Sequence, residues 1–193
     1  MAYFPFFIDI EDASGLIIGG GKHALGKMEK LLPYGSKLRV VASEVRDEVK
    51  EFAKINDIVI EFREFQDADL ETNPDFVIIA CDDMKERSRI AKLCRERRIL
   101  VNSVDDVDNC DFIFPSLIQR GKLSIGVMTG GTSPVIGMEL KKQIMSLIPD
   151  NIEEILEWME EIRPEMKEKY PDEKARAKVF REIYVEKIKK AEI

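Results

Sequence analysis

An apolar run that leads into three consecutive glycines constrains this chain more than any other feature. Residues 16–24 read Leu-Ile-Ile-Gly-Gly-Gly-Lys-His-Ala, and a helical pattern begins directly afterwards. This order predicts a strand, a tight turn at Gly19 and a helix whose first amides can hold a phosphate. Gly21 would let the backbone approach a pyrophosphate, and Ala24 would let the helix pack closely on the strand. A dinucleotide site is the favoured interpretation, and an ordinary glycine turn is the alternative.

Apolar runs alternate with helical patterns through the first 115 residues. The expected strands are 16–18, 38–41, 59–62, 76–80 and 99–102, with a short sixth at 112–114. The expected helices are 24–32, 46–54 and 85–97, and the many charges of the third should face solvent. This alternation predicts an α/β fold, a Rossmann-type doubly wound parallel sheet. Its ligand crevice should lie at the carboxyl ends of the strands.

The pattern changes after Pro115. Residues 123–127 alternate like a half-exposed strand, and a glycine-rich loop at 128–134 leads into an expected helix at 135–147. Two charged amphipathic helices, 152–162 and about 173–190, should follow, separated by Pro164 and Pro171. They are interpreted as a helical cap or a dimer-packing unit.

Composition excludes several classes of protein. The 193-residue chain has a net charge of −7, which argues against nucleic-acid binding through a basic face. No apolar run approaches the roughly 20 residues that span a bilayer, and the N-terminus lacks the basic start and cleavage site of a signal peptide. The three scattered cysteines indicate reduced thiols in a cytoplasmic protein. A single histidine argues against a histidine-rich metal cage.

The second expected strand ends where such folds contact the adenosine ribose. Glu44 stands near the position of the usual acidic residue that binds the ribose hydroxyls, and Ser43 could also donate to them. NAD is favoured over NADP because of Glu44, although Arg46 keeps binding of a 2′-phosphate open.

Two further strand ends contribute to the predicted crevice. Ala80 and Cys81 are small enough for a cofactor to lie against their backbone, while Asp82 and Asp83 are better explained as caps of the next helix. After the fifth strand, residues 103–111 contain four aspartates without the glycine and glutamate of an EF-hand. The segment is either a solvated turn or the source of a carboxylate that faces the nicotinamide.

These motifs, taken in order, carry a resemblance to a known family. The chain resembles precorrin-2 dehydrogenase, the N-terminal module of siroheme synthases, over about residues 3–149. The matching motifs are Tyr3-x-Pro5-x-Phe7, Gly19-Gly20-Gly21-x-x-Ala24, Ala80-x-Asp82-Asp83, Val101-Asn102-x-x-Asp105, Cys110-Asp111-Phe112-Ile113-Phe114-Pro115-Ser116 and Thr129-Gly130-Gly131-Thr132-Ser133-Pro134.

The resemblance implies NAD-dependent oxidation of precorrin-2 to sirohydrochlorin by a homodimer that binds the tetrapyrrole near the nicotinamide. It implies three parts: a Rossmann domain at 1–114, a small α+β dimerisation and substrate-cleft segment at 115–149, and a helical C-terminal domain at 150–193. Asp105 matches the family's key aspartate, which serves dehydrogenation and, in bifunctional members, metal insertion. Precorrin-2 is the expected partner, with no nucleic acid, membrane or resident protein metal.

The expected binding residues follow from the strand ends and the resemblance together. For the cofactor they are Gly19, Gly20, Gly21, Lys22, His23, Ser43, Glu44, Ala80, Cys81 and Asn102. For the substrate they are Thr129 and Gly130, with Arg120, Lys122, Lys141 and Lys142 as cations that offset its carboxylates. His23 departs from the family, which usually has valine there, and is interpreted as packing beside the cofactor.

Two alternatives to a simple dehydrogenase stay open. One is a bifunctional enzyme that also acts as a sirohydrochlorin ferrochelatase in the same cleft. The other is a non-catalytic dinucleotide-sensing domain, which would have no use for the Asp105 segment or for the loop at 129–134.

Overall fold

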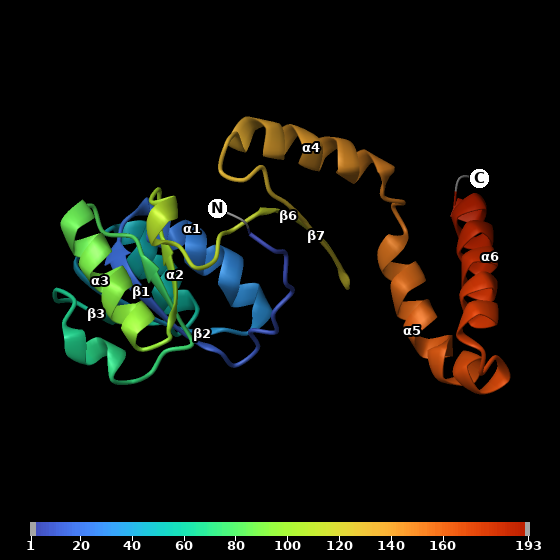
Figure 1. Ribbon diagram of the computed structural model, residues 1–193, viewed down its shortest axis with the longest axis horizontal. Helices are drawn as coiled ribbons and strands as arrows, with labels where there is room; N and C mark the ends of the chain where they lie inside the picture. The colour runs from blue at the N-terminus through green and yellow to red at the C-terminus, as the bar shows by residue number, and fades with distance from the viewer. Residues whose placement is uncertain (1–2, 192–193) are drawn as a thin grey trace. The chain divides into compact units, whose positions relative to one another are not determined.

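The computed structural model describes residues 3–191, with side chains as far as Lys187. It contains two compact units, which we describe separately (Figure 1). One comprises Phe4–Ile113, and the other comprises Phe114–Ile193 with Met1–Tyr3. The expected further division near residue 149 stays a prediction.

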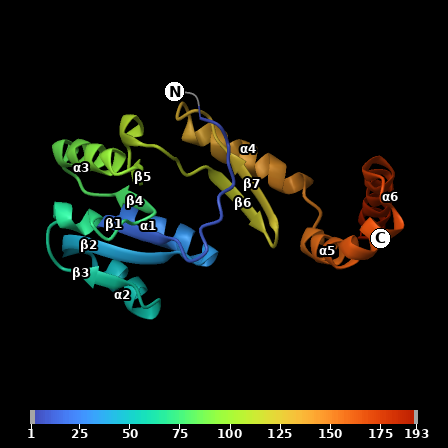
Figure 2. The ribbon, with the colours of Figure 1, turned by 60° about the horizontal axis from the view of Figure 1, so that its bottom comes forward.

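The first unit is built on a five-stranded parallel sheet in the order β3-β2-β1-β4-β5, which confirms the predicted fold class (Figure 2). Its strands are β1 (Ser14–Gly20), β2 (Lys37–Val45), β3 (Val59–Glu61), β4 (Phe76–Ile79) and β5 (Leu100–Ser103). Its helices are α1 (Lys22–Leu31), α2 (Asp47–Ile55) and α3 (Met84–Glu96), with single 3₁₀ turns η1 (Leu32–Tyr34), η2 (Asp67–Leu70) and η3 (Val107–Asn109). The chain order reverses direction across the sheet between β1 and β4, and such a switch point opens a crevice at the carboxyl edge.

Both faces of the sheet are buried, which explains why the strands are continuous apolar runs. Leu16 and Ile18 of β1 pack with Ile90 and Cys94 of α3 in one core cluster. Ile17, between them, points to the opposite face because side chains alternate along a strand, and it is fully buried. Ala24 and Met28 of α1 are likewise fully buried.

A partly buried ion network lies at the outer edge of this sheet. The Asp69 side chain, 5% exposed, accepts hydrogen bonds from Arg63, and Arg39 of β2 donates to Glu61 of β3 at 2.6 Å. The Arg63 guanidinium, which outweighs the effect of burial, holds the pKa of Asp69 below its usual value. Each charge of the network therefore has an opposite partner, as buried charges require.

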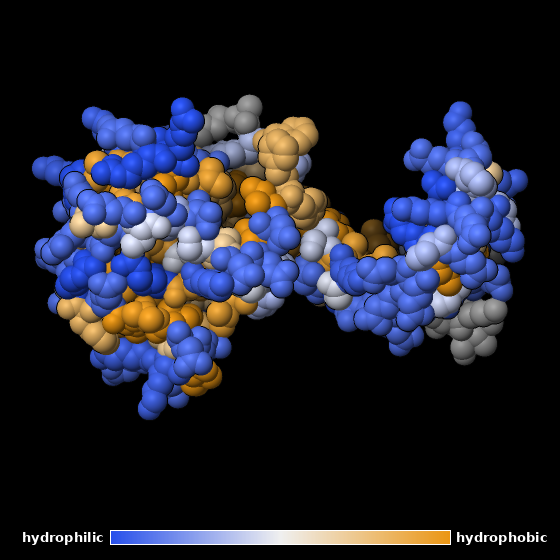
Figure 3. Space-filling model, turned by 90° about the horizontal axis from the view of Figure 1, so that it is seen from below, coloured by the Kyte–Doolittle hydropathy of each residue, from blue (hydrophilic) through white to orange (hydrophobic). Residues whose placement is uncertain are grey.

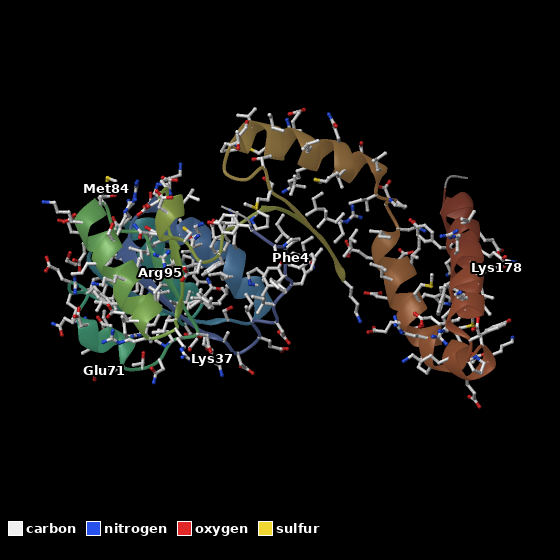
Figure 4. All side chains as sticks on the ribbon, in the orientation of Figure 1. Phe4, Lys37, Glu71, Met84, Arg95 and Lys178 are labelled. Atoms are coloured by element: carbon white, nitrogen blue, oxygen red, sulfur yellow. The ribbon has the colours of Figure 1, made fainter. Side chains whose placement is uncertain are left out.

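The second unit begins with a hairpin that sequence reasoning only half predicted. β6 (Ser116–Arg120) pairs antiparallel with β7 (Leu123–Val127) through a two-residue turn in which Gly121 has φ +52°. β7 was predicted, β6 was not, and the strand expected at 112–114 is wrong. That segment follows Asp111, whose side chain accepts from Arg95 (labelled in Figure 4) and from the Val101 amide. The chain leaves β5 there rather than extending a strand.

Three helices complete the second unit: α4 (Pro134–Leu147), α5 (Ile152–Lys169) and α6 (Glu173–Ala191). Pro164 was expected to end the first amphipathic helix, but α5 continues through it to Lys169. Pro164 is exposed, so the carbonyl that loses its amide partner can be solvated. Lys187 of α6 lies 3.9 Å over the Trp158 ring of α5. On the face that Figure 3 shows, the surface over α5 and α6 is mostly hydrophilic.

Candidate dinucleotide and substrate site

Gly19 and Gly20 are required by close backbone contacts, not by flexibility alone. Gly19 has φ +119°, and a Cβ there would lie 2.6 Å from the Ala80 carbonyl oxygen after β4. A Cβ on Gly20 would lie 2.4 Å from the Glu44 carbonyl oxygen at the end of β2. The Gly20 carbonyl also accepts from the Arg46 amide at 3.0 Å. The two glycines thus hold β1 between its neighbours at the carboxyl edge.

Gly21 has a different environment. Its backbone is in an extended conformation that any residue can adopt, with φ −88° and ψ −173°. A Cβ at Gly21 would meet no atom of residues 3–191 within 4 Å. No contact among these residues therefore requires glycine here, but the open space lies beside the first turn of α1. This is the cradle that a pyrophosphate needs at a helix N-terminus.

The end of β2 presents the side chains expected to contact the ribose. Ser43 and Glu44 are both exposed there, while the preceding Ala42 is buried. Lys22, the first residue of α1, is also exposed. The strand runs on to Val45, which pairs with Gly20 across a register shift. Ser43 and Glu44 thus lie close to the end of β2, which pairs with the glycine segment of β1.

The end of β4 is fixed by a guanidinium that sequence reasoning missed. Ala80 and Cys81 follow β4 directly and are half-buried, and Asp83 caps α3 by accepting from the Lys85 amide at 2.8 Å, as predicted. Arg87 of α3 donates to the Cys81 carbonyl at 2.5 Å and to the Val104 carbonyl at 2.6 Å. The expected solvated charge face of α3 therefore includes one arginine that joins the loop after β4 to the loop after β5.

Asp105 lies in a tight turn with an unfavourable backbone conformation. The turn runs from Ser103 to Asp106 and is closed by the Asp106 amide, which donates to the Ser103 carbonyl at 3.3 Å. Asp105 has φ +55°, a left-handed conformation that a non-glycine residue adopts at some cost. Its side chain is 79% exposed. The aspartate segment is thus a turn, and the turn presents one carboxylate to solvent.

Two buried side chains hold this turn from inside. Cys110 lies behind it, with its thiol 3.2 Å from the Ser103 amide and 3.1 Å from the Ser103 carbonyl. Burial raises the pKa of this thiol, so Cys110 is a packing group rather than a nucleophile. Asn102, 4% exposed, donates its amide to the Phe112 carbonyl at 2.9 Å.

The Asn102 side-chain oxygen Oδ1 is buried and has no hydrogen-bond partner within residues 3–191. A buried acceptor of this kind is costly. It fits the carboxamide or another N–H donor of a bound ligand at the end of β5. Together with the open space at Gly21, it shows that the residues present suit a dinucleotide.

α1 brings two basic side chains to the Asp105 turn. The His23 Nε2 lies 3.9 Å from the Asp105 Oδ2, and the His23 side chain is 59% exposed. Lys27, one turn later, interacts electrostatically with Asp105 and Cys110. Burial, reinforced by repulsion from Lys30, lowers the pKa of Lys27 to about 8. His23 therefore faces the aspartate, a contact that the sequence did not reveal.

The remaining predicted substrate residues all lie in the second unit. Thr129 closes the glycine-rich loop, because its hydroxyl donates to the Ser133 carbonyl at 2.9 Å, and Gly130 follows with φ +64°. Arg120 donates to Glu153 of α5 at 2.9 Å, and Lys122 pairs with Glu160. On α4, Lys141 is half-buried and Lys142 pairs with Glu139 at 3.2 Å.

The structure offers no resident metal site in the part it describes. Within residues 3–191, no three histidine, cysteine, aspartate or glutamate side chains gather closely enough to hold a metal ion. The same residues include no helix long and apolar enough to cross a bilayer.

The doubly wound sheet and the glycine cradle at its switch point define a dinucleotide-binding domain. A family model described as "Putative NAD(P)-binding" matches residues 6–116, more than half of the chain. The chain therefore belongs to this NAD(P)-binding family.

Curated relatives match nearly the whole chain. Siroheme synthase of Buchnera aphidicola is 34% identical over 193 residues, which is 97% of this chain and 40% of that protein. Siroheme synthase of Methylococcus capsulatus is 33% identical over 91% of this chain and 37% of that protein. The chain thus spans about two fifths of these relatives. Among solved structures, SirC, a precorrin-2 dehydrogenase, matches with a TM-score of 0.69 at 22% identity, covering 97% of this chain and all of the other, and so shares the fold.

The contrast between Gly19 and Gly21 gives a matched pair of variants. Gly21→Val should melt like the wild type but bind NAD⁺ at least about tenfold more weakly, because the side chain fills the space for the pyrophosphate. Gly19→Val should lose about 2 kcal/mol or more of stability, because it combines a positive φ with a backbone collision. Thermal unfolding and calorimetric titration with NAD⁺ measure both effects. Unchanged NAD⁺ affinity in Gly21→Val would refute the pyrophosphate placement.

The lowered pKa of Lys27 predicts a pH-dependent stability. Between the folded pKa of about 8 and the ordinary lysine pKa of 10.5, the unfolded chain binds the proton more readily than the folded protein. Wild-type stability should therefore gain a contribution as pH rises through this window. Lys27→Met has no ammonium group to bury, so it avoids the cost that the wild type carries at lower pH. It should be more stable than the wild type by about 2 kcal/mol at pH 7, with a smaller difference at pH 10. Urea unfolding at both pH values measures it, and an equal difference at both would contradict the prediction.

Proposed function

We propose that this chain carries out the NAD-dependent dehydrogenation of precorrin-2 to sirohydrochlorin in siroheme biosynthesis. The observation that carries the proposal is the Asp105 carboxylate, held in a left-handed turn beside the glycine cradle. Membership of an NAD(P)-binding family supports the cofactor. The names of the relatives, siroheme synthase and precorrin-2 dehydrogenase, support the pathway and the substrate.

The proposed roles follow from the chemistry of the reaction. The substrate loses a hydride and a proton, and bound NAD⁺ accepts the hydride. The chain's part is to orient the substrate carbon and to offer a base for the proton. Asp105 can serve as this base or as an orienting carboxylate. The polar groups of the turn, Ser103 and Asp106, and the Arg87 guanidinium hold it in place.

NAD is proposed over NADP because of the end of β2. Glu44 is exposed there and can accept from both ribose hydroxyls, whereas a 2′-phosphate would meet its charge. Arg46, the residue that favours a phosphate, lies 3.4 Å from Glu48, which partly neutralises it. The three cysteines, all free, support the expected cytoplasmic location.

A homodimer formed through the segment at 115–149 is part of the proposal. α4 exposes large apolar side chains, an unusual surface for a monomer. They are Val135, Ile136, Met138, Leu140, Met145 and Leu147. A second copy of the chain would bury them, as in an isologous interface.

Asp105 can be removed without disturbing its turn. Asp105→Asn should lower the turnover number at least about 100-fold and leave NAD⁺ affinity unchanged. Asp105→Gly should be equally inactive yet more stable, by up to about 1 kcal/mol, because glycine adopts a positive φ without strain. Anaerobic NADH formation from precorrin-2 and thermal melts measure these effects. Normal turnover in Asp105→Asn would mean that the aspartate only completes a turn.

The same assay tests the alternatives on the wild type. Absence of NADH formation would refute the proposed dehydrogenase activity and favour a dinucleotide-sensing domain. Addition of Fe²⁺ or Co²⁺ after sirohydrochlorin has formed shows whether metal insertion exceeds the uncatalysed rate, which separates a bifunctional enzyme from a simple dehydrogenase.

The dimer interface gives a further prediction. Ile136→Glu places a charge among the exposed apolar residues of α4 and should convert a dimer to a monomer in sedimentation equilibrium, because burying an unpaired charge is costly. Gln143→Glu, at an exposed polar position of the same helix, adds the same charge and should leave the dimer intact. A wild-type chain that sediments as a monomer would exclude this interface.

A further inference from the structure

α1 is basic in a chain whose net charge is −7. It carries one acidic residue, Glu29, and four residues that can hold a positive charge. These are Lys22, His23, Lys27 and Lys30. His23 and Lys27 are four residues apart, so they share one face of the helix. That face meets the Asp105 turn, since His23 lies 3.9 Å from Asp105 and Lys27 interacts with the same carboxylate.

Lys27 occupies an unfavourable position for an ammonium group. It is half-buried, and the charge of Lys30 on the next turn repels it. Asp105 offsets part of this cost, but its side chain is 79% exposed and also faces His23. Partly buried like charges of this kind are stabilised when an anion binds.

We infer that His23 and Lys27 bind a carboxylate of the tetrapyrrole and hold the macrocycle beside Asp105. This inference rests on the proposed function, because only that function supplies a ring with many carboxylates. Such a substrate is repelled by an acidic chain and by Asp105 itself. The Lys27 ammonium offsets the repulsion through a charge-assisted hydrogen bond, and the His23 imidazole adds an N–H donor next to Asp105.

The cations first expected to bind the substrate are less suitable. Arg120 and Lys122 lie against Glu153 and Glu160 of α5. Either would have to break an ion pair to bind a substrate carboxylate. The α1 face instead lies next to the Asp105 carboxylate, and it lies in the same unit as the cofactor cradle.

Binding of sirohydrochlorin, the product, tests the inference without turnover. Anaerobic equilibrium dialysis gives its Kd for the full-length wild type, Lys27→Met and Lys27→Arg. Lys27→Met should raise the Kd about tenfold or more, and Lys27→Arg should stay within about threefold of the wild type. Lys92→Met removes an exposed charge from α3, where Lys92 lies 3.9 Å from Glu96, and should leave the Kd unchanged. NAD⁺ affinity should be the same in all four proteins.

His23→Val provides a second variant, with the residue that usually occupies this position. It should raise the Kd about threefold, less than Lys27→Met, because His23 is more exposed. Thermal melts confirm that each variant is folded. If the wild type binds sirohydrochlorin and both Lys27→Met and His23→Val bind it equally well, the inference is wrong and the proposed function stands. If the wild type does not bind it, both are overturned.

Discussion

The close approach of Gly19 and Gly20 to the backbones of two neighbouring strands is the constraint on which the site depends. One glycine lies against the end of β4 and the other against the end of β2. Because no side chain fits at either position, the carboxyl end of β1 packs closely between those of β2 and β4. An open space remains at Gly21. The cofactor cradle is thus a result of how the sheet is packed.

The Asp105 turn depends on a second set of contacts, which join separate strands in the same way. Arg87 of α3 donates to carbonyls after β4 and β5, and Cys110 fills the space behind the turn. These contacts keep a carboxylate in a left-handed conformation that costs free energy. Because the backbone of the turn is fixed, the direction in which the Asp105 side chain leaves it is set before a substrate binds. The basic face of α1 then adds charge next to a geometry that is already fixed.

Local patterns predicted most of the sheet, because buried parallel strands are apolar runs and glycine marks the cradle. Tertiary contacts decided the exceptions. Nothing near Arg87 in the sequence distinguishes it from the other charges of α3, and Pro164 stays helical because its lost hydrogen bond faces solvent. The strand expected at 112–114 was wrong because Asp111 and Asn102 hold that segment against β5. The facing of His23 and Asp105 joins residues 82 positions apart, which no local spacing can reveal.

The second unit has little core of its own. Among its described side chains, the buried apolar ones are Ile118, Ile152, Ile155 and Met166, whereas α4 leaves six large apolar residues in water. Ion pairs such as Arg120 with Glu153 lie partly exposed and contribute modestly. In the proposed dimer, a unit of this composition would gain much of its stability by mass action, because a second chain would cover it. Its folding and its assembly would then be a single equilibrium, and dilution would act on it as a denaturant does.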